Sequence, residues 1–332
     1  MSKNEVTIII DGMGGDFAPV ETVKGVAASA AKNPGTHFII TGPQVAIAAE
    51  LSTHGNLDNV EIVDAPDVVD MGEEPGRAVR SKPNSSLVTA ARLVKEGRGD
   101  AFISAGNTGA AMAAALLNCG RVAGIKRPAI GVILPSATGR FVLVDAGANA
   151  DCKPEYIPQF ALMGSVYAEQ VLEIDRPRVG LLNIGGEPSK GSTFTKEAYK
   201  LLEESDVNFA GNVEGREVFE GQADVVVTDG FTGNVFLKVV EGVGKMLFDS
   251  LKENIAKGVT TKAGALLLKP ALAEIRRRND PEETGGAVLL GIDGVAIIAH
   301  GRSSATAIAN AARVAISSVE HDVVGRIKRG AA

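Results

Sequence analysis

Short apolar runs that end in glycine and small polar residues recur along the chain, and they constrain its fold more than any other feature. The run VTIII at 6–10 leads into DGMGGD, FVLV at 141–144 leads into DAGAN, and VAII at 295–298 leads into AHGRSS. Helical patterns follow these turns. Apolar strands that alternate with helices indicate a mostly parallel sheet covered on both faces. Similar runs lie at 38–40, 60–63, 100–103, 179–182 and 224–227.

One pair of runs departs from this alternation. AIGVIL (129–134) and RFVLV (140–144) are separated only by PSATG, which is typical of a hairpin rather than a crossover. We therefore expect an α/β fold whose sheet is mixed. In such sheets ligands bind beyond the carboxyl ends of the strands, so we expect the glycine-rich segments to gather on one edge.

The composition excludes several classes of protein. The 332 residues are 45% hydrophobic and 22% charged, which is ordinary globular usage and fits one large α/β unit or two domains. A net charge of −6, 4% aromatic residues and no Trp argue against a nucleic-acid partner. No run approaches the length of a membrane span, and the start shows no signal-peptide pattern, so we expect a cytoplasmic protein.

Cysteine and histidine give no sign of a metal site. Cys119 and Cys152 form no CxxC motif, and no HExxH or paired-histidine spacing occurs. Neither cysteine has the surroundings of a nucleophile, and no GxSxG elbow is present. The sequence therefore predicts chemistry without a metal or a reactive thiol.

The glycine-rich segment DGMGGD is the first candidate anion site. Its glycines allow backbone N–H groups to approach an anion, and the following helix would add its N-terminal dipole. Neither GxGxxG nor a P-loop pattern occurs in the chain, which removes the usual support for a dinucleotide or nucleotide site. A tight turn capped by Asp16 is the alternative.

Two further segments, SAGNTGA (104–110) and TDGFTGN (228–234), place glycine and then Asn or Thr at the start of a helix. The side chains of Asn107, Thr108, Thr232 and Asn234 would donate to an anion or an oxyanion, or would act only as N-caps. Elsewhere, Lys190 in NIGGEPSKGS is either a point charge for phosphate or a surface lysine. His300 is either an acid–base or anion-binding group or a structural histidine.

Residues 235–279 have a different character. Phe236, Val240, Val243, Leu247 and Leu251 follow helical spacing, and a leucine cluster at 266–268 precedes Lys269-Pro270. This predicts a helical hairpin with an apolar tip. Residues 251–278 hold seven Lys or Arg and two Glu, a local charge of +5. The hairpin is a solvated arm, a dimer interface, or a contact for an anionic membrane or an acidic protein.

Seven segments stand in the order found in one known family: DGMGGD, SAGNTGA, DAGAN, NIGGEPSKGS, GNVEGRE (211–217), DVVVTDGFTGN and HGRSS. Over roughly residues 6–318 the chain resembles the PlsX family, the bacterial phosphate acyltransferases of phospholipid synthesis. Two positions depart from the family pattern. Gly12 stands where Ala is usual, and Arg302 is an extra residue in a segment that more often reads HGSS.

The resemblance implies a fold and an activity. The fold would be a three-layer α/β/α sandwich like those of phosphotransacetylases and isopropylmalate-type dehydrogenases, forming one domain over 1–332 with the hairpin at 235–279. The activity would convert long-chain acyl-acyl carrier protein and inorganic phosphate into acyl phosphate, without a cofactor. A membrane acyltransferase would then use the acyl phosphate to acylate glycerol 3-phosphate. The family forms homodimers at the membrane surface, here the inner face of the plasma membrane.

This reaction needs an anion cradle, a cation that orients phosphate, and donors for the oxyanion of the thioester. We expect Lys190 to orient phosphate and Asn234 to donate to the oxyanion, with His300 as a third catalytic candidate. The expected substrate-binding residues are Gly14, Gly15, Asp16, Asn107, Thr108, Asn149, Gly185, Gly186, Ser192, Asp229, Thr232 and Gly233. The expected contacts with the membrane or the carrier protein are Lys262, Leu266, Leu267, Leu268, Lys269, Arg276 and Arg277.

Three other functions stay open at this point. A phosphotransacetylase of the same fold would use acyl-coenzyme A in place of acyl carrier protein. An NAD-dependent dehydrogenase has less support, because the chain lacks GxGxxG and a metal-binding carboxylate cluster. A membrane-surface scaffold would bind lipid without turnover, and likeness of fold alone does not decide among these functions.

Overall fold

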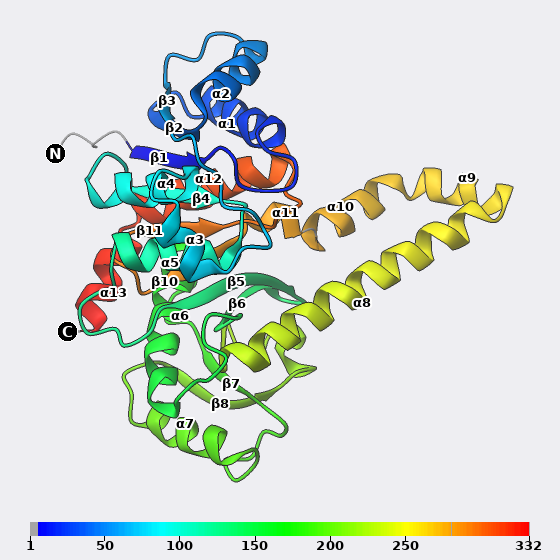
Figure 1. Ribbon diagram of the computed structural model, residues 1–332. Coiled ribbons are helices and arrows are strands. Elements are labelled where there is room, and N and C mark those ends of the chain that lie inside the picture. The colour runs from blue at the N-terminus through cyan, green and yellow to red at the C-terminus, as the bar shows by residue number, and fades with distance from the viewer. Residues whose placement is uncertain (1–5, 280, 332) are drawn as a thin grey trace.

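The strands of the chain form one twisted sheet at the centre of the molecule (Figure 1). The computed structural model describes residues 6–279 and 281–331, leaving out the side chains of Val259, residues 276–279 and Pro281. Within these ranges eleven strands pair in the order β3-β2-β1-β4-β11-β10-β5-β6-β9-β7-β8. The strands are β1 (Val6–Asp11), β2 (Thr36–Gly42), β3 (Val60–Asp64), β4 (Ala101–Ser104), β5 (Ala129–Ser136), β6 (Gly139–Val144), β7 (Val179–Asn183), β8 (Phe209–Glu214), β9 (Val225–Val227), β10 (Ala287–Leu290) and β11 (Val295–Ile298).

The sheet is mixed, as the sequence predicts. Seven of its strand pairings are parallel, and three are antiparallel: β11 with β10, β10 with β5, and β5 with β6. The predicted hairpin is therefore confirmed as β5 and β6, which pair from Gly131↔Val144 to Ser136↔Gly139. The sequence prediction missed β10, whose insertion beside β5 adds the other two antiparallel steps.

Helices cover both faces of the sheet and complete the three predicted layers. On one face α1, α12, α6 and α7 pack against the strands, and on the other α3, α4, α5 and the start of α8 do so. The helices are α1 (Val20–Lys32), α2 (Gln44–Leu51), α3 (Pro75–Ser81), α4 (Ser86–Lys95), α5 (Thr108–Asn118), α6 (Ile157–Val171), α7 (Thr193–Glu203), α8 (Gly230–Ala256), α9 (Val259–Leu267), α10 (Lys269–Asn279), α11 (Pro281–Thr284), α12 (Ala305–Glu320) and α13 (Val323–Ala331).

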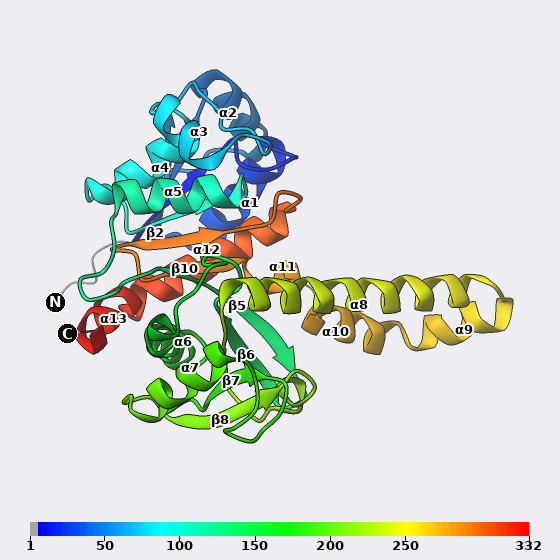
Figure 2. The ribbon, with the colours of Figure 1, turned by 60° about the horizontal axis from the view of Figure 1, so that its bottom comes forward.

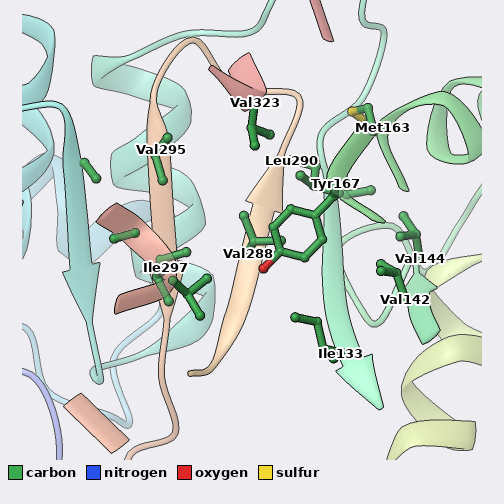
Figure 3. Close-up of a cluster of buried hydrophobic side chains, with 14 of the residues drawn as sticks. Ile133, Val142, Val144, Met163, Tyr167, Val288, Leu290, Val295, Ile297 and Val323 are labelled. Atoms are coloured by element: carbon green, nitrogen blue, oxygen red, sulfur yellow. The ribbon is translucent and has the colours of Figure 1, made fainter. Parts of the chain in front are cut away.

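The core lies in two layers because successive side chains of a strand point to opposite faces. Ile8 and Ile10 of β1 belong to the layer under α1 and α12, whereas Ile9 belongs to the layer under α4. In the first layer Tyr167 of α6 lies across Val288 of β10, next to Ile133 of β5 (Figure 3). The continuous apolar runs of the sequence are thus strands that are buried on both sides.

Helices α8, α9 and α10 project from the sheet as a long arm (Figures 1 and 2). Here the predicted tip is misplaced. The chain reverses at Lys257 and Gly258, while Leu266 to Leu268 lie at the junction of α9 and α10 on the returning side. The helical arm is interrupted at Leu268, directly before Lys269-Pro270, because proline is tolerated in the first turn of a helix but not in its interior and α10 begins anew at Lys269.

The apolar stripe predicted along this arm is also divided. Phe236 stacks on Phe219 and anchors α8 to the sheet, with ring centroids 5.7 Å apart. Val240, Leu247 and Leu251 line a groove between α8 and the sheet, whereas Val243 lies on another face of α8 and does not line it. Among the described residues no helix combines the length and apolar content that crossing a membrane requires.

Candidate functional site

Strand direction divides the sequence motifs between two edges of the sheet. Three antiparallel steps separate β11 from β6, so β6, β7, β8 and β9 run opposite to β1, β2, β3, β4 and β11. The expectation that all the motifs gather on one edge is therefore wrong. We call residues 11–16, 104–110 and 299–304 the β1 cluster, and residues 145–149 and 228–234 the β6 cluster.

The β1 cluster is held together by Asp11, whose carboxyl group is buried. Ser104 Oγ donates to Asp11 Oδ2 at 2.7 Å, and the Gly106 N–H donates to Ser104 Oγ at 3.1 Å. Burial raises the pKa of Asp11, while hydrogen bonds from Ser86 and Ser104 oppose that rise. A Cβ atom at Gly14 would lie 2.7 Å from the Asp11 carboxylate, so only glycine fits there. The predicted Gly14 is thus required by packing.

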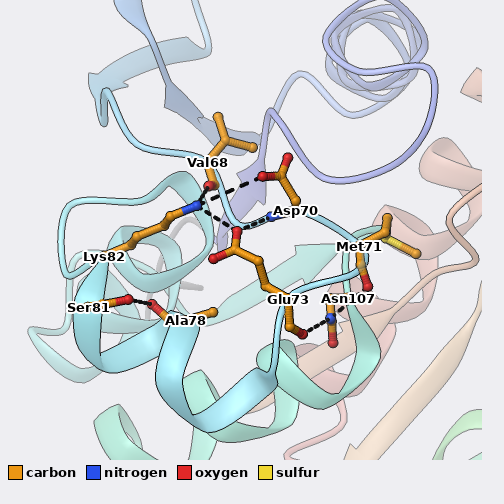
Figure 4. A network of polar contacts seen from close by, with 8 residues as sticks. All are labelled: Val68, Asp70, Met71, Glu73, Ala78, Ser81, Lys82 and Asn107. Atoms are coloured by element: carbon orange, nitrogen blue, oxygen red, sulfur yellow. Dashed lines mark hydrogen bonds and ion pairs between the residues drawn. The ribbon is translucent and has the colours of Figure 1, made fainter.

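The predicted donor Asn107 is already fully used (Figure 4). Its Oδ1 accepts from the Ala110 N–H at 3.0 Å and caps α5, and its Nδ2 donates to the carbonyl oxygens of Met71 and Glu73, both at 3.0 Å. Lys82 Nζ holds the same loop through Glu73, at 2.5 Å. Asn107 is therefore a cap and a tether, while Thr108 beside it is exposed.

The β6 cluster is built on Asp145, which is fully buried. Its Oδ1 accepts from the N–H groups of Ile130, Gly147 and Ala148 at 2.9 to 3.1 Å. Its Oδ2 accepts from both the backbone N–H and the Nδ2 of Asn149, each at 2.8 Å. The predicted ligand Asn149 is thus engaged with this carboxylate, and Asp145 itself is a residue that the sequence reasoning missed.

Helix α8 begins directly on this loop. Asp229 caps it, accepting from the Thr232 N–H at 2.8 Å and from Thr232 Oγ1 at 2.7 Å. The N–H of Gly230 donates to the Asn149 carbonyl oxygen at 2.9 Å, and a Cβ atom at Gly233 would collide with the Asp145 carbonyl oxygen. These contacts cap α8 and fix its position, through Asp229, Thr232 and Gly233. The TDGFTGN motif therefore acts here as a helix cap, the alternative to anion binding that the sequence left open.

Asn234 is the member of the motif that stays available. A Cβ atom at Gly147 would lie 2.8 Å from Asn234 Nδ2, which shows that the carboxamide rests on the glycine of the DAGAN loop. The side chain is exposed and makes no hydrogen bond with any residue of the described ranges. Its amide nitrogen and oxygen are therefore available as donor and acceptor for a ligand.

A groove of about 1220 Å³ joins the two clusters. Thr108 and His300 of the β1 cluster line it together with Gly147 and Asn234 of the β6 cluster. Helix α8 makes this possible because it starts at the β6 cluster and reaches the β1 cluster within three turns, where Glu241 Oε1 lies 3.9 Å from His300 Nε2.

Two charged residues on α8 extend the polar end of this groove. Lys238 Nζ donates to Glu241 Oε2 at 2.7 Å, and both side chains line the groove. Neither was singled out from the sequence. Lys238 and Glu241 follow Asn234 by four and seven residues. This helical spacing would have placed the three side chains on one face of α8 from the sequence alone.

The loop that carries Lys190 lies apart from the groove lining. Asn183 Nδ2 donates to the Lys190 carbonyl oxygen at 3.3 Å, and Ser192 caps α7 through the Thr195 N–H at 3.2 Å. The Lys190 ammonium forms no ion pair within the described part of the chain. The structure thus groups Thr108, Asn234 and His300 and leaves Lys190 out of their groove. The other candidates outside its lining are Gly14, Gly15, Asp16, Asn107, Asn149, Gly185, Gly186, Ser192, Asp229, Thr232 and Gly233.

The cysteines do not supply a nucleophile at neutral pH. Burial, followed by the charges of Asp145 and Asp229, raises the pKa of Cys152 to about 12. Burial, followed by Asp293, raises that of Cys119 to about 11. The groove's described lining contains neither Ser nor Cys.

Known sequences match this chain over nearly its whole length. The family model described as "Fatty acid synthesis protein" matches residues 6–326. A phosphate acyltransferase of Clostridium acetobutylicum is 50% identical over 97% of this chain and 98% of its own length. One from Elusimicrobium minutum is 48% identical over 97% of this chain and 95% of its own.

Solved structures share the fold at much lower identity. A phosphotransacetylase from Streptococcus pyogenes covers 96% of this chain and 95% of its own, with a TM-score of 0.65 and 17% identity. A 4-hydroxythreonine-4-phosphate dehydrogenase from Klebsiella pneumoniae covers 95% and 100%, with a TM-score of 0.54 and 13% identity. These two likenesses confirm the predicted fold and no more.

Replacing Asp145 by Asn should destabilise the protein strongly. An amide nitrogen cannot accept hydrogen bonds, so some of the N–H groups that now donate to the Asp145 carboxylate would lose their acceptor. We expect the free energy of unfolding to fall by about 3 kcal/mol or more. The matched Asp151→Asn change, at an exposed position nearby, should alter it by less than about 0.5 kcal/mol. Urea denaturation measures both, and equal effects would contradict the anchoring role of Asp145.

The thiol of Cys152 should react slowly at neutral pH. Because only the thiolate is alkylated, the rate with iodoacetamide should rise about tenfold per pH unit up to pH 10, as a pKa of about 12 requires. Peptide mass spectrometry follows the labelling, and the same cysteine in denatured protein should level off near its ordinary pKa. If the alkylation rate of folded protein stopped rising below pH 10, the raised pKa of Cys152 would be contradicted.

Proposed function

The chain belongs to the phosphate acyltransferase family, and from that premise we propose that this enzyme transfers a long acyl chain from acyl carrier protein to inorganic phosphate. The product, an acyl phosphate, would supply a membrane acyltransferase that acylates glycerol 3-phosphate. The observation that carries the proposal is that Thr108, Asn234 and His300 line one groove together with a long apolar surface.

The reaction needs no nucleophile from the protein, which agrees with a groove whose described lining has no Ser or Cys. A phosphate oxygen attacks the thioester carbonyl carbon, a C–O bond forms, and the carbonyl electron pair moves onto oxygen. When that oxyanion collapses, the C–S bond breaks and the carrier protein leaves as a thiolate. A thiol with a pKa near 8.5 is a fair leaving group.

We assign the oxyanion donor to Asn234, because its carboxamide is free and rests on Gly147. Thr108 lies at the N-terminus of α5, where the helix dipole favours an anion such as phosphate. His300 lies near Glu241, with Nε2 3.9 Å from Oε1. We propose that its imidazole binds the incoming phosphate. We keep Lys190, on its loop beyond β7, as the cation that orients phosphate.

The activity itself is tested with purified protein, phosphate and hexadecanoyl-acyl carrier protein, with hexadecanoyl-coenzyme A in a parallel reaction. Acyl phosphate is trapped as its hydroxamate. We expect phosphate-dependent product from the carrier-protein donor only. Equal product from coenzyme A would favour the phosphotransacetylase-like alternative, and absence of product in both reactions would favour the scaffold.

Asn234→Ala and Lys190→Ala should each lower turnover by about 100-fold or more, the usual cost of removing one oxyanion or anion donor. The controls are Asn56→Ala and Lys196→Ala, at exposed positions outside the motifs, which should keep normal turnover. Steady-state rates and unfolding curves are measured together. A near-normal rate for a folded variant removes that residue from the mechanism, and for Lys190 it would transfer the phosphate role to the groove.

We further propose that the arm binds the inner face of the plasma membrane. Leu266, Leu267 and Leu268 are 71%, 83% and 58% exposed at the α9–α10 junction. Lys262 and Lys269 flank them, and such a pairing of leucines and cations suits an anionic lipid surface. Arg276 and Arg277, also predicted contacts, have side chains outside the described residues.

Leu267→Glu should abolish cosedimentation with phosphatidylglycerol vesicles, because it places a charge among the exposed leucines, while turnover in detergent is kept. The matched control is Val45→Glu on α2, where the side chain is 85% exposed; that variant should still bind. Binding by both variants would show that the leucine cluster is not the anchor.

A homodimer would cover the second apolar face of α8. Val235, Val239, Val243 and Met246 are 46% to 60% exposed and do not line the groove. We propose that the same helix of a second copy packs here. Light scattering should then give twice the 34.3 kDa mass of the chain, and a monomeric mass would remove the proposal.

A further inference from the structure

We infer that the acyl chain lies along α8, in the groove between α8, α10 and β5, and that Gly244 marks where longer chains must pass. This inference deepens the proposed function and rests on it. We call this part of the groove the acyl groove. Its apolar lining includes six residues of α8: Leu237, Val240, Leu247, Phe248, Leu251 and Ile255.

The acyl groove is continuous with the reaction site. Asn234, the proposed oxyanion donor, and Leu237, which is 8% exposed, both line it and lie one turn apart on α8. A thioester carbonyl held by Asn234 therefore places its first methylene groups against Leu237 and Val240. From there the lining continues along the same helix to Ile255.

The length of the acyl groove suits a long chain. Asn234 and Leu251 are seventeen residues apart, which is about 26 Å along a helix that rises 1.5 Å per residue. A fully staggered sixteen-carbon chain, with C–C bonds of about 1.5 Å, extends about 19 Å. A short acyl group such as acetyl would leave most of this surface uncovered, so the groove favours long-chain donors.

The apolar side chains that would touch the chain are incompletely covered by the protein itself. Leu247 and Phe248 are 60% and 37% exposed. An alkyl chain removes such surface from water, which is favourable and non-directional. The other exposed face of α8, with Val239 and Met246, does not line the groove, so the helix has separate surfaces for the chain and for a second copy.

Gly244 offers a position at which the acyl groove can be closed. It lies ten residues beyond Asn234, about 15 Å along α8, and it lines the groove. A Cβ atom added there meets no heavy atom within 4 Å, so a side chain can start at this position without a clash at its first atom. Gly242 is equally open and does not line the groove, but it lies one turn from Val239 and from Met246 on the proposed dimer face. It therefore serves as the control together with light scattering, which must show that Gly242→Leu keeps the oligomeric state of the parent.

The test compares Gly244→Leu, Gly242→Leu and the parent protein with octanoyl-, dodecanoyl- and hexadecanoyl-acyl carrier protein. Leucine has a higher helix propensity than glycine, so neither change should unfold α8. We expect Gly244→Leu to lower kcat/KM for the hexadecanoyl donor at least tenfold relative to the octanoyl donor. The Gly242→Leu ratio should match the parent. Binding of the fluorescent fatty acid cis-parinaric acid should weaken at least tenfold in Gly244→Leu only.

The outcomes separate the inference from the proposed function. Unchanged chain-length ratios and unchanged fatty-acid binding in Gly244→Leu would overturn the acyl groove while leaving the acyltransferase in place. Selective loss of fatty-acid binding in a protein that forms no acyl phosphate would support the groove and overturn the proposed function. A change of oligomeric state in Gly244→Leu, seen by light scattering, would show that a second copy fills the groove and would overturn the inference.

Discussion

The buried carboxylate of Asp145 holds the site in shape. A charged group out of water is stable only when hydrogen bonds replace its solvation, and here five N–H groups from β5, the DAGAN loop and Asn149 do so. The loop that results carries Gly147, on which Asn234 rests, and it receives the glycine face of α8. The position of the Asn234 carboxamide therefore depends on a buried residue that does not itself line the groove.

Helix α8 links the loop that Asp145 holds to the groove and to the arm. Its capped N-terminus belongs to the β6 cluster, its third turn reaches His300 in the β1 cluster, and its remainder forms the arm. Because the two clusters lie at strand ends of opposite direction, no single sheet edge could bring them together. The groove between them exists because α8 runs from one cluster to the other, and its apolar continuation connects the proposed site of phosphate chemistry with the surface proposed to meet lipid.

Much of this could be predicted from the sequence, and the failures have physical reasons. Doubly buried strands give continuous apolar runs, so the α/β class and the β5–β6 hairpin were found. Strand β10 was missed because its sequence AVLL is mostly Ala and Leu, which favour helices, whereas the neighbouring run VAII is mostly β-branched. Glycine and asparagine weaken the strand signal of β8. The donors Asn107 and Thr232 proved to be engaged at helix caps, an ambiguity that only hydrogen-bond partners resolve. Asp145 carries no pattern that separates a ligand from an anchor.

The most direct measurement is a crystal structure of the protein with a non-hydrolysable acyl phosphonate of sixteen carbons. The account predicts a phosphonate or carbonyl-equivalent oxygen within hydrogen-bond distance of Asn234 Nδ2, close to Thr108, and an alkyl chain that passes Gly244 and contacts Leu247 and Phe248. A head group bound away from both Asn234 and Thr108, with the chain outside the α8 groove, would contradict both the site and the path of the acyl chain.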